Sequence, residues 1–296
     1  MKVYRIGWLS PTTGPRPTFR EALRKLGWIE GKTIAFEIRS AEGHRERLPA
    51  LAAELVGANV DVIVAVAPAA IRAAKQATTR IPIVMAWWGG EDLAESKIVA
   101  SFARPGGNIT RVHMMLTTLD AKRLELLHGA VPQARKIAAL IHDRELFVPQ
   151  LLSLREVAQK AGIELLVVNT QENDRGYDGA FEAIDRAGAG ALLVMGSPDF
   201  ARDRKRIMEL AARWRLPAIY GDGARDGGLM TYGATEEELD RQAARYVDKI
   251  LKGANPGELP IEQPTRFRFV INLKTAKAIG LTMPRSLVLQ ADQVID

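Results

Sequence analysis

Short apolar runs alternate with longer helical patterns from one end of the chain to the other. The run at residues 62–66, Val-Ile-Val-Ala-Val, is continuous and rich in β-branched residues, which is typical of a strand buried on both faces of a parallel sheet. Strands that alternate with helices predict an α/β fold with doubly wound parallel sheets and right-handed crossovers.

The first part of the chain holds one set of these elements. Strands are predicted at residues 2–9, 33–38, 61–66 and 82–86. Helices are predicted between them at residues 17–26, 48–57 and 68–78.

The same order then restarts. Strands are predicted at residues 136–141, 164–168, 191–195 and 217–220, and helices at residues 149–162, 179–187 and 198–214. Each strand begins about 130 residues after its counterpart in the first set, a repeat that predicts two similar lobes. The alternative is a single large α/β sheet in which the spacing repeats by coincidence.

The chain is expected to cross between the lobes more than once. A turn-rich stretch at residues 104–110 leads into a predicted short strand and then a helix at 119–129, and the first crossing is expected near 114–119. The helical pattern at 236–251 predicts the return, and residues 267–280 are expected to cross again, to a lobe that the pattern leaves open. The predicted lobes are residues 1–116 with about 233–262, and residues 117–232 with about 263–296.

Composition agrees with a two-domain globular protein. The chain has 296 residues, of which 47% are hydrophobic and 26% charged, and no apolar run reaches the ~18 residues of a membrane span. There is no cysteine, which excludes disulfides, thiol nucleophiles and zinc–thiolate sites. The chain enters a strand pattern at once, without a secretory leader. We therefore expect either a cytoplasmic protein or a secreted one whose leader is missing from this sequence.

The net charge of +6 and the pI of about 9.6 raise the question of nucleic-acid binding. The basic residues are interleaved with acids on amphipathic helices, as at residues 202–206, and no helix-turn-helix or RNA-binding motif occurs. The pattern favours a solvated basic surface over a nucleic-acid partner.

Ligands of open parallel sheets bind beyond the carboxyl ends of the strands, and two facing lobes would place these loops around one cleft. Ser10, Thr12 and Thr13 follow the first strand. Ala67, Pro68 and Ala69 follow the third, with Pro68 at the favoured first position of a helix whose N-terminus suits an anionic ligand group. Ordinary helix capping is the alternative for these loops.

The fourth strand is followed by Trp87, Trp88 and Gly89. One tryptophan is expected to face the cleft as an aromatic wall, and the alternative is that both pack in the core. The second-lobe candidates at strand ends are His142, Asp143, Ser197 as a helix N-cap, Tyr220 and Asp222. Either aspartate would pair with a ligand ammonium or stabilise its own loop as an Asx turn.

Catalytic, metal and cofactor patterns are not found. The four histidines, His44, His113, His128 and His142, form no metal-ligand spacing. No serine nucleophile elbow, G-x-G-x-x-G or phosphate-binding loop occurs. We predict no catalytic residue, no metal and no cofactor, and hence no enzyme.

Six stretches, spread nearly end to end, are similar to one known family, the ABC transporter substrate-binding proteins of the tryptophan/tyrosine-binding type. They are residues 5–11, 48–55, 103–110, 122–127, 227–233 and 270–281. The resemblance implies a type I periplasmic-binding architecture, with two Rossmann-like lobes and a hinge of crossover strands. It also implies a monomer outside the cytoplasm, periplasmic or lipid-anchored, that delivers ligand to a permease and its ATPase.

The resemblance implies as ligand an amino acid or small carboxylate, aromatic ligands included. It places in the family's ligand loops the candidates after the first and third strands, Ser10, Thr12, Thr13 and residues 67–70, and the second-lobe candidates His142, Asp143, Ser197, Tyr220 and Asp222. Three loops depart from the family pattern. Ala67 replaces a threonine or serine, residues 87–92 replace small residues and Asp-Pro, and His142-Asp143 replaces Asn-Pro. Two alternative functions stay open, a ligand-sensing domain of a regulatory system and a cleft enzyme on the same scaffold.

Overall fold

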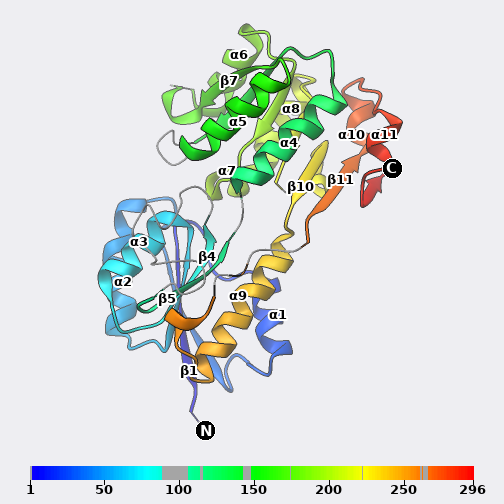
Figure 1. The fold of residues 1–296 in the computed structure, drawn as a ribbon. Helices are drawn as coiled ribbons and strands as arrows, with labels where there is room; N and C mark the ends of the chain where they lie inside the picture. Colours follow the sequence, from blue (N-terminus) through cyan, green and yellow to red (C-terminus); the bar gives the residue numbers. More distant parts are fainter. Residues whose placement is uncertain are drawn as a thin grey trace. The chain divides into compact units, whose positions relative to one another are not determined.

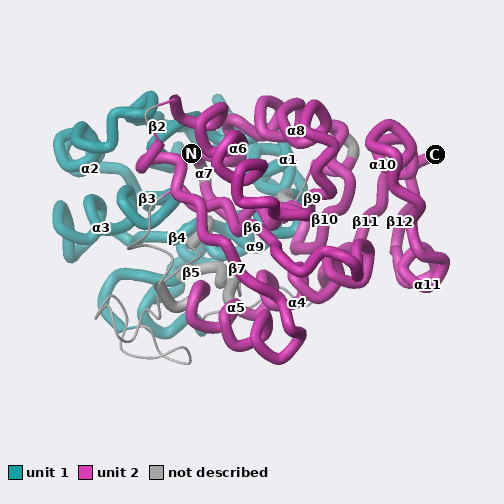
Figure 2. Tube along the Cα trace, turned by 90° about the horizontal axis from the view of Figure 1, so that it is seen from above, with its two compact units in different colours: residues 1–114, 236–265 teal, residues 115–235, 266–296 magenta. Residues whose placement is uncertain are grey.

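The computed structural model describes residues 2–88, 106–113, 116–142, 148–173, 175–221, 223–260, 262 and 266–296 (Figure 1). Within these ranges it describes no side chain at residues 87–88, 111–113, 116–117, 148–149, 198, 225 and 236. The chain divides into two compact units, residues 1–114 with 236–265 and residues 115–235 with 266–296 (Figure 2). The chain therefore passes from one unit to the other at three points.

Unit 1 is built on a five-stranded sheet in the order β2-β1-β3-β4-β5, and every pairing in it is parallel. The strands are β1 (Tyr4–Ser10), β2 (Ile34–Ser40), β3 (Val62–Val66), β4 (Ile83–Trp88) and β5 (Ile109–His113). The helices are α1 (Pro17–Lys25), α2 (Leu48–Gly57), α3 (Ala67–Ala77) and α9 (Glu236–Leu251), with short 3-10 turns at Arg45–Arg47 and Pro256–Glu258. Helices α2 and α3 pack together, and α1 packs against α9 (Figure 1).

Unit 2 has a seven-stranded sheet in the order β12-β11-β10-β9-β8-β6-β7. The strands are β6 (Lys136–Ile141), β7 (Glu164–Asn169), β8 (Ala191–Val194), β9 (Ala218–Tyr220), β10 (Met230–Gly233), β11 (Arg268–Asn272) and β12 (Gln293–Ile295). Among the strand pairings that the structure describes in this sheet, only β10–β11 is antiparallel. The α-helices are α4 (Leu116–Ala130), α5 (Val148–Lys160), α6 (Gly176–Arg186), α7 (Pro198–Arg202), α8 (Arg204–Arg213), α10 (Leu273–Ala278) and α11 (Arg285–Val288), with 3-10 turns η3 (Thr170–Glu172) and η4 (Ala224–Asp226).

The predicted α/β class with mostly parallel sheets is confirmed, and the alternative of one large sheet is wrong, because the strands form two separate sheets. The final segment, whose lobe the pattern left open, supplies β11 and β12 to the sheet of unit 2.

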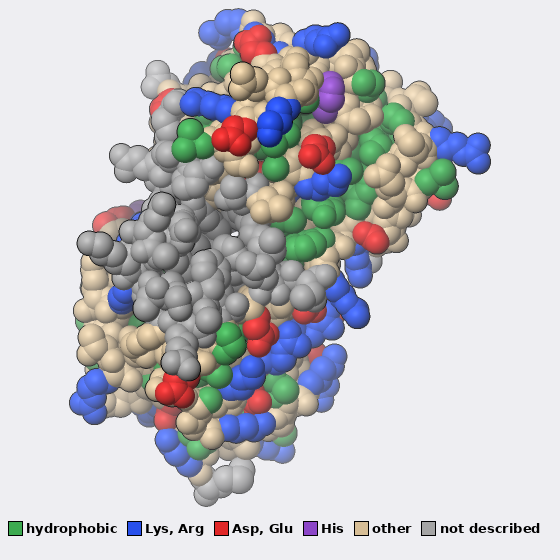
Figure 3. Space-filling view, in the orientation of Figure 1, with side chains coloured by type: hydrophobic (Ala, Val, Ile, Leu, Met, Phe, Trp, Pro, Cys, Tyr) green, Lys and Arg blue, Asp and Glu red, His purple; other side chains and the backbone are tan. Residues whose placement is uncertain are grey.

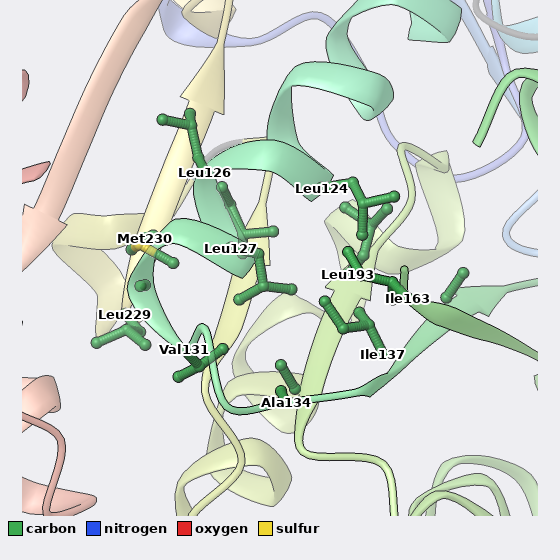
Figure 4. Packing of buried hydrophobic residues seen from close by; sticks show 14 of the residues in the cluster. Leu124, Leu126, Leu127, Val131, Ala134, Ile137, Ile163, Leu193, Leu229 and Met230 are labelled. Carbon is green, nitrogen blue, oxygen red and sulfur yellow. The ribbon is translucent and has the colours of Figure 1, made fainter. Parts of the chain in front are cut away.

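Each unit has its own apolar core. All five residues of β3 are buried, as the continuous β-branched run predicts for a central strand. In unit 2, Leu124 and Leu127 of α4 pack with Ile137 of β6 and Leu193 of β8 (Figure 4). Burying one such leucine contributes about 1.5–3 kcal/mol to the free energy of unfolding. The packing of these leucines therefore anchors α4 to the sheet of unit 2.

Two element predictions are corrected by the structure. The helix expected at 119–129 after a short strand begins earlier, because the short strand β5 ends at His113 and α4 already starts at Leu116. The single helix expected over 198–214 is two helices, because the backbone of Asp203 (φ −94°, ψ 12°) leaves helical geometry between α7 and α8. The Asp203 carboxylate is bonded there by Tyr177 and Arg202.

Basic and acidic side chains are interspersed on the face of the molecule drawn in Figure 3. Within the part of the chain that the structure describes, no helix is both long and apolar enough to span a bilayer.

Candidate ligand-binding site

The loop after β1 is ordered by its own serine. Ser10 is 1% exposed, and its Oγ accepts the backbone N–H groups of Thr12 and Thr13, each at 3.2 Å. The indole Nε1 of Trp8 donates to the carbonyl oxygen of Thr13 at 2.9 Å. The Ser10 hydroxyl is thus engaged in holding the turn, whereas Thr12 is half-buried and Thr13 exposed.

The loop after β3 lies beside it at the same edge of the sheet. Leu9 of β1 pairs with Ala65 of β3 in a parallel register, so both strands end together. Ala67 opens α3 with a positive φ of 71°, although it carries a side chain and is 4% exposed. Such strained residues gather at functional sites.

Pro68 is the second residue of α3, and it and Ala69 are half-buried. No side chain caps this helix at Val66. The first backbone N–H groups of α3 therefore have no side-chain cap at the edge that carries Thr12 and Thr13, an arrangement suited to an anionic group.

The end of β4 belongs to the same edge, since Val66 of β3 pairs with Ala86 of β4. The backbone of Trp87 and Trp88 lies in β4, where the pairing with β5 is irregular between Met85 and Trp88. The side chains of both tryptophans, and Gly89 altogether, lie outside the described residues.

In unit 2, His142 follows β6, the strand between β7 and β8. Its Nδ1 is 3.0 Å from the Oγ1 of Thr170, which follows β7. Its Nε2 is 3.6 Å from an Oδ2 of Asp199, which follows β8, and 3.3 Å from the Nε2 of Gln171. The imidazole therefore joins three strand ends at the carboxyl edge of this sheet.

The polar network continues through α7. Ser197 caps this helix, as predicted, by accepting the N–H of Asp199. Arg202 binds Asp199 at 3.4 Å and Asp203 at 2.7 and 2.8 Å, and Tyr177 of α6 donates to Asp203 at 2.8 Å. The hydrogen bonds from Arg202 hold the pKa of Asp203 below its usual value, so the carboxylate is ionised at neutral pH.

Tyr220, at the end of β9, is 4% exposed and packs in the core cluster of α6, α8 and β8. Burial raises the pKa of its phenol above the ordinary value. Most of the ring therefore packs in the core. The ligand contact expected of Tyr220 stays a prediction. Asp143 and Asp222 lie outside the described residues.

Thr170 and Asp199 were missed by sequence reasoning. Thr170 directly follows β7, and Asp199 lies at the start of α7, the helix that follows β8. Both belong to the edge where ligands of parallel sheets bind, so examining every strand-to-helix connection alike would have found them. Their approach to His142 depends on the strand order, which the sequence does not state.

Within the ranges that the structure describes, no three His, Asp or Glu side chains converge on a point that could hold a metal ion.

The model of one protein family, described as ABC transporter substrate binding protein, matches residues 15–295. The "Tyrosine-binding protein" of Clostridioides difficile (strain R20291) is 25% identical over 269 residues, which cover 89% of this chain and 75% of that protein.

Solved structures share the fold. A conserved domain protein from Vibrio cholerae superposes with a TM-score of 0.88 at 23% identity. The ABC domain from Streptococcus pneumonia in complex with L-Trp superposes with a TM-score of 0.86 at 22% identity. Each alignment covers 99% of this chain and 100% of the other. Because the family model spans almost the whole sequence, this chain belongs to the ABC transporter substrate-binding protein family.

Proposed function

We propose that the chain captures an amino acid, with an aromatic side chain favoured, and that the loops at the carboxyl edges of its sheets bind it. The observation that carries the proposal is the placement of the predicted loops. In each unit the candidate residues whose positions are described stand at the carboxyl ends of neighbouring parallel strands, where ligands of such sheets bind. The tyrosine-binding relative and the L-Trp complex support this ligand class.

The two edges offer complementary chemistry for an amino acid. In unit 1 the start of α3 and Thr13, an exposed residue with a hydroxyl group, suit a carboxylate. The tryptophans at the end of β4 would provide an aromatic wall. In unit 2 the candidates for the ammonium group are acidic, Asp143 and Asp222, and they follow strand ends of the other sheet.

Membership in the family supports the remaining parts of the proposal. The protein would act outside the cytoplasm as a monomer, close its two units on the ligand and present it to a membrane permease driven by an ATPase. Closure requires that the ligand bind the closed form better than the open one.

A catalytic function is less well supported. The contact of Thr170 with His142, and of His142 with Asp199, has the composition of a nucleophile–base–acid triad. However, Thr170 is buried, and its hydroxyl is hydrogen-bonded to the Nδ1 of His142. The Oδ2 of Asp199 lies 3.6 Å from the Nε2 of His142, and Asp199 also accepts a hydrogen bond from Arg202. The group therefore serves better as a scaffold for the edge than as a nucleophile.

The experiment is a thermal-shift and calorimetric comparison of four probes with the purified chain. L-Tyrosine and L-tryptophan carry both charged groups, whereas tyramine lacks the carboxylate and 3-(4-hydroxyphenyl)propionate lacks the ammonium. An amino acid at about one hundred times its dissociation constant stabilises the protein by about 2.7 kcal/mol, which raises the unfolding temperature by several degrees.

Binding of the amino acids and loss of affinity for both truncated probes is the expected result. The proposal is contradicted if none of the twenty amino acids or a set of aromatic acids shifts the transition, and mass spectrometry finds no small molecule released on denaturation.

A further inference from the structure

An ion pair lies buried in α4. Asp120 is 0% and Arg123 2% exposed, and the NH1 of Arg123 is 2.5 Å from the Oδ1 of Asp120. Among the residues that the structure describes, the Oδ2 of Asp120 has no hydrogen-bond partner. Burial raises the pKa of Asp120, although Arg123 acts in the opposite direction.

This pair is poorly explained by stability alone. Desolvating two charges is costly, and their attraction offsets the cost only when the remaining polar atoms are also bonded. Replacing such a pair by apolar side chains of similar volume is often neutral or stabilising. A buried carboxylate that leaves one oxygen unbonded therefore calls for another explanation.

Arg123 also reaches a strand far away in the sequence. Its Nε donates to the carbonyl oxygen of Tyr232, in β10, at 2.6 Å. A Cβ atom at Gly233 would lie 3.0 Å from the NH2 of Arg123, and one at Gly221 would lie 3.2 Å from it. The two glycines thus leave the space that the guanidinium fills, and its planar fork binds α4 and β10 at once.

The two elements joined by Arg123 are those by which the chain enters and leaves unit 2. The boundary between the units falls between residues 114 and 115, and α4 begins at Leu116. Strand β10 ends at Gly233, and the chain returns to unit 1 between residues 235 and 236. The link is therefore internal to unit 2 but lies next to two of its three connections.

We propose that Asp120 and Arg123 are positioning residues for ligand capture, which hold the start of α4 and the end of β10 together so that both connections move as one. The inference rests on the proposed function, in which the units close on a ligand. Apparent affinity falls with the fraction of protein in the binding-competent form. Removing the Arg123 link between α4 and β10 is thus expected to change the affinity for the ligand without altering any ligand contact.

The principal variant is the double substitution Asp120→Leu/Arg123→Met, which removes both charges and retains apolar volume. It should fold, because replacing both partners avoids an unpaired buried charge. Leu127→Ala is the matched control, since Leu127 is fully buried on the same helix and its loss leaves a destabilising cavity without touching the link.

The first measurement needs no ligand. Hydrogen exchange of backbone amides is compared in peptides that cover residues 116–122 and 230–238. We expect the double variant to exchange faster than the wild type in both peptides, and the control to show no selective increase there. Wild-type exchange in either peptide of a folded double variant overturns the inference.

The second measurement is calorimetric titration with L-tyrosine and L-tryptophan. The double variant should change the dissociation constant about fivefold or more, and the control should stay within about twofold. An unchanged constant in the double variant overturns the inference. If the wild type binds neither amino acid, that result counts against the proposed function, and the exchange comparison decides the link by itself.

Should the double variant not fold, Arg123→Lys replaces it in both measurements. Lysine keeps the charge beside Asp120 but replaces the planar fork by a single ammonium group. Faster exchange in both peptides supports the link, and wild-type exchange overturns it.

Discussion

Ala67 has a backbone conformation that residues with side chains rarely adopt. Its φ of 71° falls where a Cβ atom is disfavoured, and the residue is nevertheless placed at the strand-to-helix turn of the candidate site. Strain of this kind costs about 1–3 kcal/mol and persists only where the surrounding structure enforces it.

We therefore predict that Ala67→Gly raises the free energy of unfolding by about 1 kcal/mol, because glycine adopts positive φ without strain. Ala69→Gly is the control, as Ala69 lies within α3 and glycine in a helix lowers stability by about 0.5–1 kcal/mol. Chemical denaturation measures both. Equal effects of the two substitutions would show that Ala67 is not strained.

Asp203 is expected to make the free energy of unfolding depend on pH. Its folded-state pKa is lowered, chiefly by the hydrogen bonds from Arg202, below the usual 3.8. A group with a lowered folded pKa contributes stability above its unfolded pKa and loses it as pH falls through the folded value.

Asp203→Asn should thus lower the free energy of unfolding at pH 7 by about 1–2 kcal/mol, and the difference from wild type should shrink as the pH falls below 3.8. Denaturation curves at several pH values measure it. Asp178→Asn is the control, because the Asp178–Arg206 pair is exposed and such pairs contribute little. A difference that persists unchanged at low pH contradicts this assignment.

At the scale of elements, the end of β10 and the residue that follows β9 approach so closely that their contact depends on glycine. A Cβ atom at Gly233 would lie 2.7 Å from the carbonyl oxygen of Gly221, which is backbone and cannot turn aside. By contrast, a Cβ atom at Gly57, the last residue of α2, would meet nothing within 4 Å.

Gly233→Ala should lower the free energy of unfolding by about 1–3 kcal/mol through this overlap. Gly57→Ala should raise it by about 0.5–1 kcal/mol, because alanine favours the helix. Thermal denaturation of the two variants separates the steric overlap at Gly233 from the helix preference of alanine at residue 57. Stabilisation by both substitutions would mean that β9 and β10 separate without cost.

The elements themselves were largely predictable. The central strands and the helices α2 and α9 have the predicted bounds or nearly so, because a buried strand and an amphipathic helix carry their periodicity locally. The break between α7 and α8 was not, since residues 198–214 continue a helical pattern. It occurs where the Asp203 carboxylate is bonded by Tyr177 of another helix.

At the scale of the whole molecule, each unit has a separate core. The clusters around Ile63 in unit 1 and around Leu193 in unit 2 share no residue. Units with independent cores have local stabilities of their own, although three connections join them.

Leu193→Ala should therefore lower the stability of unit 2 by about 2–5 kcal/mol and leave the slow amide exchange of β3 in unit 1 close to wild type. Native-state hydrogen exchange measures both units in one experiment. An equal loss of protection in β3 would show that the two units unfold as one.

The sequence by itself determined the α/β class, the repeat of strand–helix units and the loops in which the candidate residues stand, because these depend on spacing along the chain. Only the tertiary structure decided which of these residues meet. His142 reaches Thr170 and Asp199 because β6 lies between β7 and β8. Arg123 reaches Tyr232 because β10 packs beside α4. Such contacts join segments far apart in sequence, and no local pattern of polar and apolar residues encodes the order in which strands pair.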